Sequence, residues 1–230
     1  MTEPLFVLRD LQKSYRGRVV LDIPQLTLYS GQSYALIGAN GSGKSTLLRL
    51  LAGMIAPTAG SIESCYPPQD IAYLPQKPYA FSFSVLRNLT MALPAGAADK
   101  QTTALAALKE VGLDSLQAAR GDRLSGGESQ RLSVARLLMG KQRLLLLDEP
   151  TSATDIAGNE LIESALKNYR RRHHCDLIFA THALSQAARM ADQVLFFAGG
   201  RIVEQGETAR LLHHPQSAEC QAFLRFWQNS

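Results

Sequence analysis

The stretch Tyr34–Thr46, YALIGANGSGKST, decides the fold that the sequence predicts. Its first part, up to Ile37, is an apolar run typical of a buried strand, and from Lys44 onward the apolar residues recur at helical spacing. Between them, Gly38–Ser45 matches the pattern Gly-x-x-x-x-Gly-Lys-Ser. A glycine-rich turn would match by chance in about one such chain in a hundred. A strand, this loop and a helix in this order predict an α/β core that binds phosphate.

The loop carries the groups that a nucleoside triphosphate needs. Its glycines let backbone N–H groups close around phosphate oxygens, and the start of the following helix adds a partial positive charge. We expect Lys44 to reach the β- and γ-phosphates of ATP and Ser45 to hold Mg²⁺. The candidate nucleotide-binding residues are Gly38, Asn40, Gly41, Ser42, Gly43, Lys44, Ser45 and Thr46.

Two adjacent acids follow a second apolar run. Leu144–Leu147 is short and unbroken, which favours a buried strand, although the pattern alone does not exclude a helix. Asp148 and Glu149 would then emerge at the carboxyl edge of the sheet, where open α/β folds bind ligands. Acids at a strand end can simply be solvated. In a chain with a phosphate loop, they predict a metal ligand in Asp148 and, in Glu149, a group that orients or deprotonates the attacking water.

A second anion-binding helix start is predicted at Leu124–Glu128, LSGGE. Ser125 and Glu128 form the Ser-x-x-Glu pattern of a capping box. The box does not explain Gly126 and Gly127, because glycine lowers helix stability but lets backbone approach a ligand closely. We therefore expect Ser125, Gly126, Gly127 and Glu128 to form a second anion-binding helix start in a chain that already has one.

The remaining pattern predicts one domain, residues 1–230, with a helical lobe inserted in an α/β core. The N-terminal part is rich in short strands, such as Val19–Leu21 and Leu26–Leu28 on either side of Pro24. Residues from about 77–140 show helical spacing, and later strands alternate with helices, which implies a mostly parallel sheet. The expected limits are 1–76 and 141–230 for the core and about 77–140 for the helical subdomain.

The composition narrows the classes of protein to which this chain can belong. The net charge of +4 and the pI near 9.0 suit nucleic acid or a membrane surface, but the only basic run, Arg170–His174, favours a solvated helix terminus over a binding patch. Cys65, Cys175 and Cys220 are far apart, which argues against a disulfide framework or a zinc site and favours a reducing compartment. No run reaches the roughly 18 apolar residues of a membrane span, so we expect a soluble protein whose membrane role needs a partner.

In their order along the chain, these motifs resemble those of the nucleotide-binding subunit of ATP-binding cassette (ABC) transporters. Gly38–Ser45 resembles its Walker A loop, Leu124–Glu128 its signature and Leu144–Glu149 its Walker B strand. The resemblance implies a P-loop NTPase core with a mostly parallel sheet, an N-terminal antiparallel β subdomain and an inserted helical subdomain. It also implies an active ATPase that uses ATP and Mg²⁺.

The resemblance adds three single residues. Tyr15 resembles the aromatic that stacks on adenine, Gln76 the glutamine that links nucleotide to the helical lobe, and His182 the switch histidine that bonds the γ-phosphate. Without the neighbouring motifs, Tyr15 would be expected to be a packing residue, Gln76 a surface residue and His182 a loop histidine with its hydrogen bonds satisfied. The implied catalytic residues are Glu149, His182 and Gln76, and the implied metal ligands are Ser45, Gln76 and Asp148.

In the family, two subunits meet head to tail with ATP between the Walker A loop of one and the signature of the other. Ser125 and Gly127 would then act on the partner's γ-phosphate, and the dimer would close with ATP and open after hydrolysis. Two positions depart from the family pattern. Glu128 stands where glutamine is commoner and is expected to weaken nucleotide bridging, and the D-loop Ser152–Asp155 has threonine where leucine usually precedes the aspartate.

A separate ATPase subunit of this kind resembles those of bacterial importers and some exporters, which implies a cytoplasmic protein at the inner face of the membrane. Its partners would be an integral-membrane permease and, for an importer, an extracytoplasmic substrate-binding protein. The aromatic stretch Pro78–Leu86 is expected either to dock the permease or to pack inside the lobe. The ending Gly206–Ser230 and the stretch Gln76–Leu89 look similar to those of tungstate, molybdate or phosphate importers.

The alternative function is a soluble ABC ATPase acting on nucleic acid or ribosomes, which the pI near 9.0 slightly favours. Such proteins usually carry two cassettes in one chain or a long coiled coil. Neither is present in this sequence, so transport is favoured and no nucleic-acid partner is expected.

Overall fold

The computed structural model describes residues 3–228, so the outer limits of the predicted domain, Met1 and Ser230, lie outside the described range. The chain divides into two compact units. The first consists of Met1–Tyr73, Arg143–Asp148 and Asp176–Ser230, and the second of Leu74–Gln142 and Glu149–Cys175.

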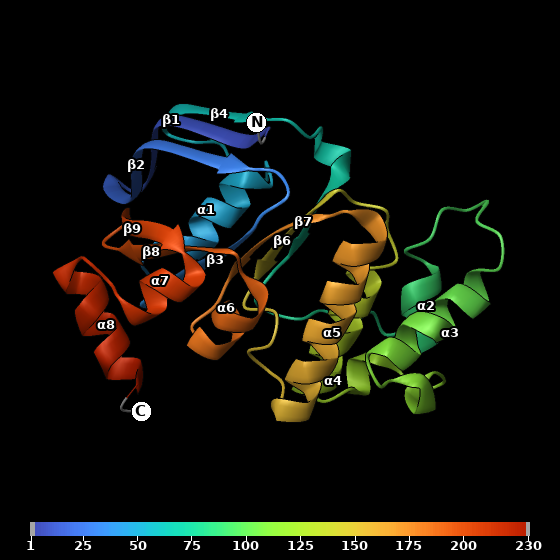
Figure 1. Cartoon of the computed structure of the whole chain (residues 1–230). Coiled ribbons are helices and arrows are strands. Elements are labelled where there is room, and N and C mark those ends of the chain that lie inside the picture. The colour runs from blue at the N-terminus through green and yellow to red at the C-terminus, as the bar shows by residue number, and fades with distance from the viewer. Residues whose placement is uncertain (1–2, 229–230) are drawn as a thin grey trace. The chain divides into compact units, whose positions relative to one another are not determined.

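The first unit contains an antiparallel sheet of three strands, in the order β2-β1-β4 (Figure 1). Its strands are β1 (Pro4–Tyr15), β2 (Arg18–Tyr29) and β4 (Ala59–Ser64). The prediction of separate strands at Val19–Leu21 and Leu26–Leu28 was wrong, because β2 runs through Pro24 without a break. Since β2 is an edge strand, the missing N–H of Pro24 need not cost a ladder hydrogen bond.

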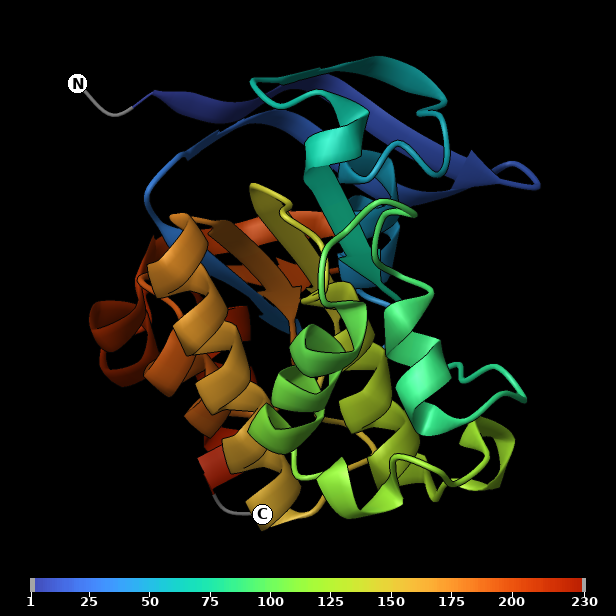
Figure 2. The same cartoon turned by 90° about the vertical axis from the view of Figure 1, so that its right-hand side faces the viewer.

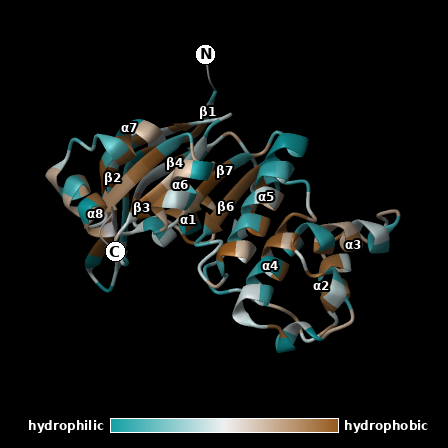
Figure 3. Cartoon of the chain, turned by 60° about the horizontal axis from the view of Figure 1, so that its bottom comes forward, coloured by the Kyte–Doolittle hydropathy of each residue, from teal (hydrophilic) through white to brown (hydrophobic). Residues whose placement is uncertain are grey.

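The first unit also contains a six-stranded sheet in the order β5-β6-β7-β3-β8-β9. Its pairs β6–β7, β7–β3 and β3–β8 are parallel and β8–β9 is antiparallel, which confirms the mostly parallel core. The central strands β3, β6 and β7 are buried over their whole length, and this explains their unbroken apolar sequences. Figure 3 shows β6 and β7 in hydrophobic colours. The bounds are β3 (Ser33–Gly38), β5 (Ile71–Leu74), β6 (Leu144–Asp148), β7 (Asp176–Ala180), β8 (Gln193–Ala198) and β9 (Arg201–Glu207).

One hydrophobic core joins both sheets of this unit to helix α1. Leu48 of α1 packs in the same cluster as Leu8 of β1 and Leu146 of β6. The helices of the unit are α1 (Lys44–Leu51), α6 (Leu184–Met190), α7 (Thr208–His213) and α8 (Ala218–Gln228), with a 3₁₀ turn at Pro68–Asp70.

Two aspartates fasten the amino edge of the parallel sheet. Asp176, at the start of β7, accepts hydrogen bonds from Ser30 Oγ (2.8 Å), Gly31 N (2.7 Å) and Tyr66 Oη (3.0 Å). Asp192, just before β8, accepts from Ser33 N (2.8 Å) and Ser33 Oγ (2.6 Å) at the start of β3. The amino ends of three neighbouring strands are therefore tied to each other or to adjoining loops.

The second unit is built from four helices around its own core (Figure 2). Val85, Leu108, Leu132 and Ala165, one from each helix, belong to one buried cluster. The helices are α2 (Val85–Thr90), α3 (Lys100–Glu110), α4 (Gly126–Leu137) and α5 (Ile156–His173), and 3₁₀ turns lie at Asp114–Leu116 and Gly121–Arg123. Within residues 3–228, no helix combines the length and the apolarity that crossing a membrane requires.

Candidate functional site

The loop between β3 and α1 has a backbone that requires glycine at two positions. Gly38 ends β3 with a φ of 142°, and Gly43 precedes α1 with a φ of 109°. A Cβ atom at Gly38 would lie 2.2 Å from Phe197 O, and one at Gly43 would lie 2.9 Å from Leu21 Cδ1. Glycine thus allows the loop to pack closely on its neighbours and to present amides at a helix start.

Two polar side chains of the loop are buried. Lys44 is 5% exposed, and its Nζ donates to Gly38 O (2.7 Å) and Ala39 O (3.0 Å). The Ser42 hydroxyl is buried and has no hydrogen-bond partner within the described residues. Leaving such a group unsatisfied costs about 1–3 kcal/mol, and an anion in the loop would supply the missing acceptor. The loop therefore fits a phosphate group.

Beside the loop, a hydroxyl and a carboxylate form a candidate metal site. Ser45 Oγ, in the first turn of α1, donates to Asp148 Oδ1 at 2.8 Å. Asp148 ends β6 and is fully buried. Its other oxygen, Oδ2, accepts a hydrogen bond from Tyr73 Oη of β5 at 3.3 Å, and Arg49 Nε donates to the same Tyr73 oxygen at 3.5 Å. The carboxylate is thus held on both of its oxygens.

Tyr73 and Arg49 were not predicted as site residues. Burial is the main cause that raises the pKa of Tyr73, so its phenol keeps its proton and can donate at neutral pH. The hydrogen bond to Tyr73 raises the pKa of Arg49. The only sequence signal for Arg49 is its spacing, since it follows Ser45 by one helical turn and lies on the same face of α1.

Oxygen ligands of this kind suit Mg²⁺, which takes one or two carboxylates together with waters and substrate phosphates. Ser45 and Asp148 supply one hydroxyl and one carboxylate. Residues 3–228 contain no group of three or more His, Cys, Asp or Glu side chains that could hold a metal without such help. The pair therefore fits Mg²⁺ that arrives with a nucleotide.

Glu149, the predicted base, directly follows β6 and is 6% exposed. Its backbone is left-handed, with a φ of 53°, which costs a residue other than glycine on the order of 1–3 kcal/mol, and strain of this kind clusters at active sites. Gln130 of α4, which belongs to the same unit, donates from Nε2 to Pro150 O (2.9 Å) and Glu149 O (3.5 Å). Sequence reasoning missed Gln130, for which the only signal is a polar residue at a buried helix position.

The three residues that came from the family resemblance lie in different surroundings. Tyr15 ends β1 with 46% of its surface exposed, and Lys13 Nζ lies 5.2 Å from its ring centroid. Gln76 follows β5 and is exposed. His182 is half-buried and follows β7. Their roles stay predictions.

The capping box at the start of α4 is present. Glu128 N donates to Ser125 Oγ (3.3 Å), and Ser125 N donates to Glu128 Oε2 (2.8 Å). The hydrogen bond from the Ser125 backbone lowers the pKa of Glu128, so its carboxylate is charged at neutral pH. Gly126 and Gly127 form the first turn, whose N–H groups have no partner within a helix. This helix start therefore suits an anion, with one negative charge already in its first turn.

The segment Ser152–Asp155 forms the turn before α5. Asp155 Oδ1 accepts a hydrogen bond from Gly158 N at 2.8 Å, which makes Asp155 the N-cap of α5. Thr154 Oγ1 donates to Thr151 O at 2.9 Å. A Cβ atom at Gly127 would lie 3.1 Å from Ala153 O, so this turn packs closely against the start of α4.

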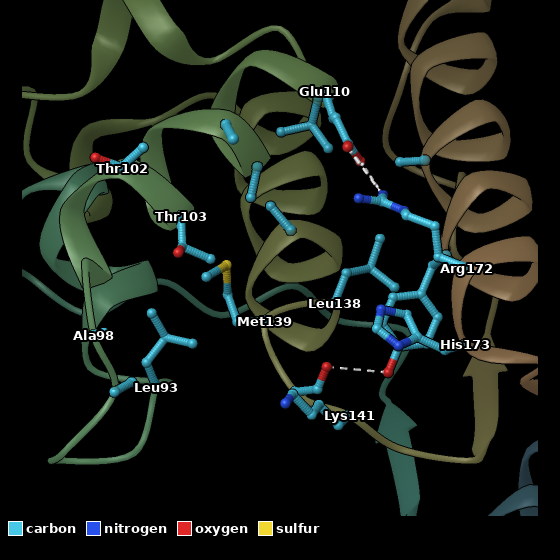
Figure 4. Close-up of a pocket in the computed structure, with 18 residues that line it drawn as sticks. Leu93, Ala98, Thr102, Thr103, Glu110, Leu138, Met139, Lys141, Arg172 and His173 are labelled. Carbon is cyan, nitrogen blue, oxygen red and sulfur yellow. Dashed lines mark hydrogen bonds and ion pairs between the residues drawn. The ribbon is translucent and has the colours of Figure 1, made fainter.

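A cavity of about 650 Å³ lies among α3, α4 and α5 of the second unit (Figure 4). Alanines and other apolar side chains form its walls, and its described lining contains none of the predicted site residues. At its rim, Arg172 donates to Glu110 at 2.9 Å, and the His173 ring packs on Tyr169 with a centroid distance of 4.5 Å. The basic run Arg170–His174 lies at the end of α5, where Arg170 Nε donates to Cys175 O and Arg171 donates to Asn168 Oδ1.

Comparisons with known proteins agree with these motifs. A family model described as ABC transporter matches residues 21–152. The chain is 37% identical over 203 residues to a tungstate uptake system ATP-binding protein of Peptoclostridium acidaminophilum. This match covers 85% of this chain and 95% of the relative. It is 36% identical over 198 residues to a zinc import ATP-binding protein of Pseudomonas fluorescens, with coverage of 85% and 74%.

Among solved structures, cbiO1 from Clostridium perfringens, part of the ABC transporter complex cbiONQ, is similar with a TM-score of 0.79. It is 25% identical, and the match covers 92% of each chain. The residues that the family model matches include the phosphate loop, the capped helix start and the acidic strand end. The chain therefore belongs to the ABC transporter family and is an ATP-binding, ATP-hydrolysing subunit.

Proposed function

We propose that this ATPase binds ATP with Mg²⁺ at the loop Gly38–Ser45 and hydrolyses it with Glu149 as the general base. The observation that carries the proposal is the Ser45–Asp148 hydrogen bond of 2.8 Å beside the glycine loop. Lys44 and the unpaired hydroxyl of Ser42 would hold phosphate oxygens. Tyr15 would stack on adenine, in keeping with its exposed ring.

In the proposed reaction, Glu149 takes a proton from water as the water oxygen attacks the γ-phosphorus, and the bond to the β–γ bridging oxygen breaks to leave ADP and phosphate. His182 would donate a hydrogen bond to the γ-phosphate, and Gln76 would join the metal ligands Ser45 and Asp148. Mg²⁺, when bound, neutralises charge on the phosphate oxygens.

A second subunit completes each site in this proposal. The capped start of α4 offers free amides of Gly126 and Gly127 to an anion, although the chain already has one phosphate loop. A head-to-tail dimer uses both, with Ser125 to Glu128 contacting the nucleotide on the partner. ATP would then close the dimer, and hydrolysis would open it.

We further propose that the subunit drives a bacterial importer from the inner face of the cell membrane, together with a permease and an extracytoplasmic binding protein. The relatives named above are uptake or import proteins. An oxyanion such as tungstate, molybdate or phosphate is the proposed cargo, in line with the tungstate relative. The exposed aromatics Tyr79, Phe81 and Phe83 offer a surface for the permease.

Glu149→Gln tests the chemistry. We expect kcat to fall about 10²- to 10⁴-fold with ATP binding retained, because the amide cannot take the proton. Glu160→Gln, on the exposed face of α5, is the matched control. Hydrolysis by Glu149→Gln at the parental rate would remove Glu149 from the mechanism. Recovery of a permease with the tagged protein from membranes would support transport, whereas salt-sensitive recovery of RNA or DNA would overturn it in favour of the nucleic-acid alternative.

A further inference from the structure

The Asp148 carboxylate is buried, and its two oxygens are held by different elements. Oδ1 accepts from Ser45 Oγ of α1 at 2.8 Å, and Oδ2 accepts from Tyr73 Oη of β5 at 3.3 Å. Because β5 is the neighbour of β6 in the sheet, the phenol lies beside the end of β6 that carries Asp148. All of these residues belong to the first unit.

Tyr73 is itself held in place. Its ring is half-buried and packs against the core of the first unit. Its hydroxyl accepts a hydrogen bond from Arg49 Nε at 3.5 Å, so the proton of the hydroxyl is left for Asp148. Ser45 and Arg49 lie one turn apart on α1. The helix therefore contacts the Asp148 carboxylate directly through Ser45. It also contacts the carboxylate indirectly, because Arg49 donates to Tyr73 and Tyr73 donates to Asp148.

We propose that Tyr73 is a positioning residue for the Mg²⁺ site: its hydroxyl fixes one oxygen of Asp148 so that the other is presented to Ser45 and the metal. The proposal rests on the proposed function of Asp148 as a metal ligand. A free carboxylate turns about two side-chain bonds, and a hydrogen bond to the oxygen that faces away from the metal removes that freedom before the metal arrives. Partners of this kind typically change metal affinity about 10- to 100-fold.

Tyr73→Phe removes the hydroxyl and keeps the ring. We expect the Mn²⁺ or Mg²⁺ concentration for half-saturation to rise by about tenfold, the low end of that range, because 3.3 Å is long for an O–H···O bond. The direct measurement is a titration of Mn²⁺ by electron paramagnetic resonance in the presence of a non-hydrolysable ATP analogue. In steady-state assays, the KM for Mg²⁺ should rise with kcat nearly unchanged at saturating Mg²⁺.

The chain offers a matched control in Tyr66→Phe. Tyr66 Oη also donates to a buried aspartate of the first unit, Asp176, at 3.0 Å, but this pair lies at the amino edge of the sheet. We expect Tyr66→Phe to lower the free energy of unfolding at least as much as Tyr73→Phe and to leave Mn²⁺ binding unchanged. An equal loss of Mn²⁺ binding in both variants would show a general effect of stability and overturn the positioning role.

Asp148→Asn distinguishes the positioning role of Tyr73 from the proposed metal-ligand role of Asp148. If Asp148 is a metal ligand, this variant loses Mn²⁺ binding far more than Tyr73→Phe, and adding Tyr73→Phe to it causes little further loss. If Asp148→Asn loses binding while Tyr73→Phe binds Mn²⁺ like the wild type, the positioning role fails and the metal site stands. If Asp148→Asn binds Mn²⁺ normally, the proposed metal site itself is refuted.

Discussion

Replacing Glu128 with glutamine should change folding and nucleotide binding in opposite directions. In the wild type, the ionised carboxylate accepts a hydrogen bond from Ser125 N at 2.8 Å in the first turn of α4, where the helix dipole stabilises negative charge. A hydrogen bond to a charged group contributes about 1.5–3 kcal/mol, and one between neutral groups about 0.5–1.5 kcal/mol. Glutamine can keep the neutral bond of a capping box, so we expect the free energy of unfolding to fall by about 1 kcal/mol.

The same change removes a negative charge from the helix start that is proposed to face the partner's ATP. Two unit charges 4 Å apart repel by about 1 kcal/mol in bulk water and about 4 kcal/mol near a protein surface. We therefore expect the dissociation constant of the ATP-bound dimer to fall at least about fivefold in Glu128→Gln.

Urea unfolding of the isolated protein measures the first effect, and sedimentation with ATP, in a Glu149→Gln background that blocks turnover, measures the second. Glu160→Gln changes the same functional group at an exposed position of α5 and controls for net charge. A weaker or unchanged dimer in Glu128→Gln would refute the placement of Glu128 near nucleotide. Unchanged stability would refute the strength assigned to the cap.

The stability effect has a defined dependence on pH. Because the Ser125 backbone lowers the pKa of Glu128 in the folded state, the contribution of the carboxylate is fully present above the pKa of an unfolded glutamate. It is lost as the pH falls through the lowered folded-state pKa. The stability difference between wild type and Glu128→Gln should therefore shrink in acid.

Two further substitutions test the fold around the site. Gly38→Ala should destabilise the protein by more than about 2 kcal/mol, measured by urea unfolding, because its Cβ would lie 2.2 Å from Phe197 O at a φ of 142°. Asn88→Ala should cost about 1–3 kcal/mol and weaken capture of the permease, since fully buried Asn88 bonds Phe81 N (2.8 Å) and Phe81 O (3.1 Å) and so shapes the aromatic stretch. If either variant were about as stable as the wild type, the explanation given for that residue would be contradicted.

The parts of the site that the sequence predicted are those with local causes. The glycines of Gly38–Ser45 are needed by the backbone of one loop, and the Ser125–Glu128 box is formed by residues within one helical turn. Asp148 could be placed because a short, unbroken apolar run predicts a buried parallel strand. Each of these signals is complete within a few consecutive residues.

The residues that the sequence did not predict depend on the order of strands and on packing. Tyr73 reaches Asp148 only because β5 lies next to β6, a neighbourhood that no spacing along the chain encodes. Gln130 of α4 donates to the backbone of Pro150, which lies in the segment between β6 and α5. The continuity of β2 through Pro24 likewise follows from an edge position, which is a property of the assembled sheet.

The two aspartates at the amino ends of β7 and β8 have a consequence for how the protein tolerates change. Asp176 and Asp192 use their hydrogen bonds to hold the amino ends of the central strands, at the edge opposite the proposed nucleotide loop, and these contacts do not involve the proposed catalytic residues. Side-chain substitutions around the proposed nucleotide site, apart from positions such as Gly38 whose backbone requires glycine, would then alter turnover or coupling and leave folding largely intact. One fold can then be adapted to many transporters by changes at one edge of the parallel sheet.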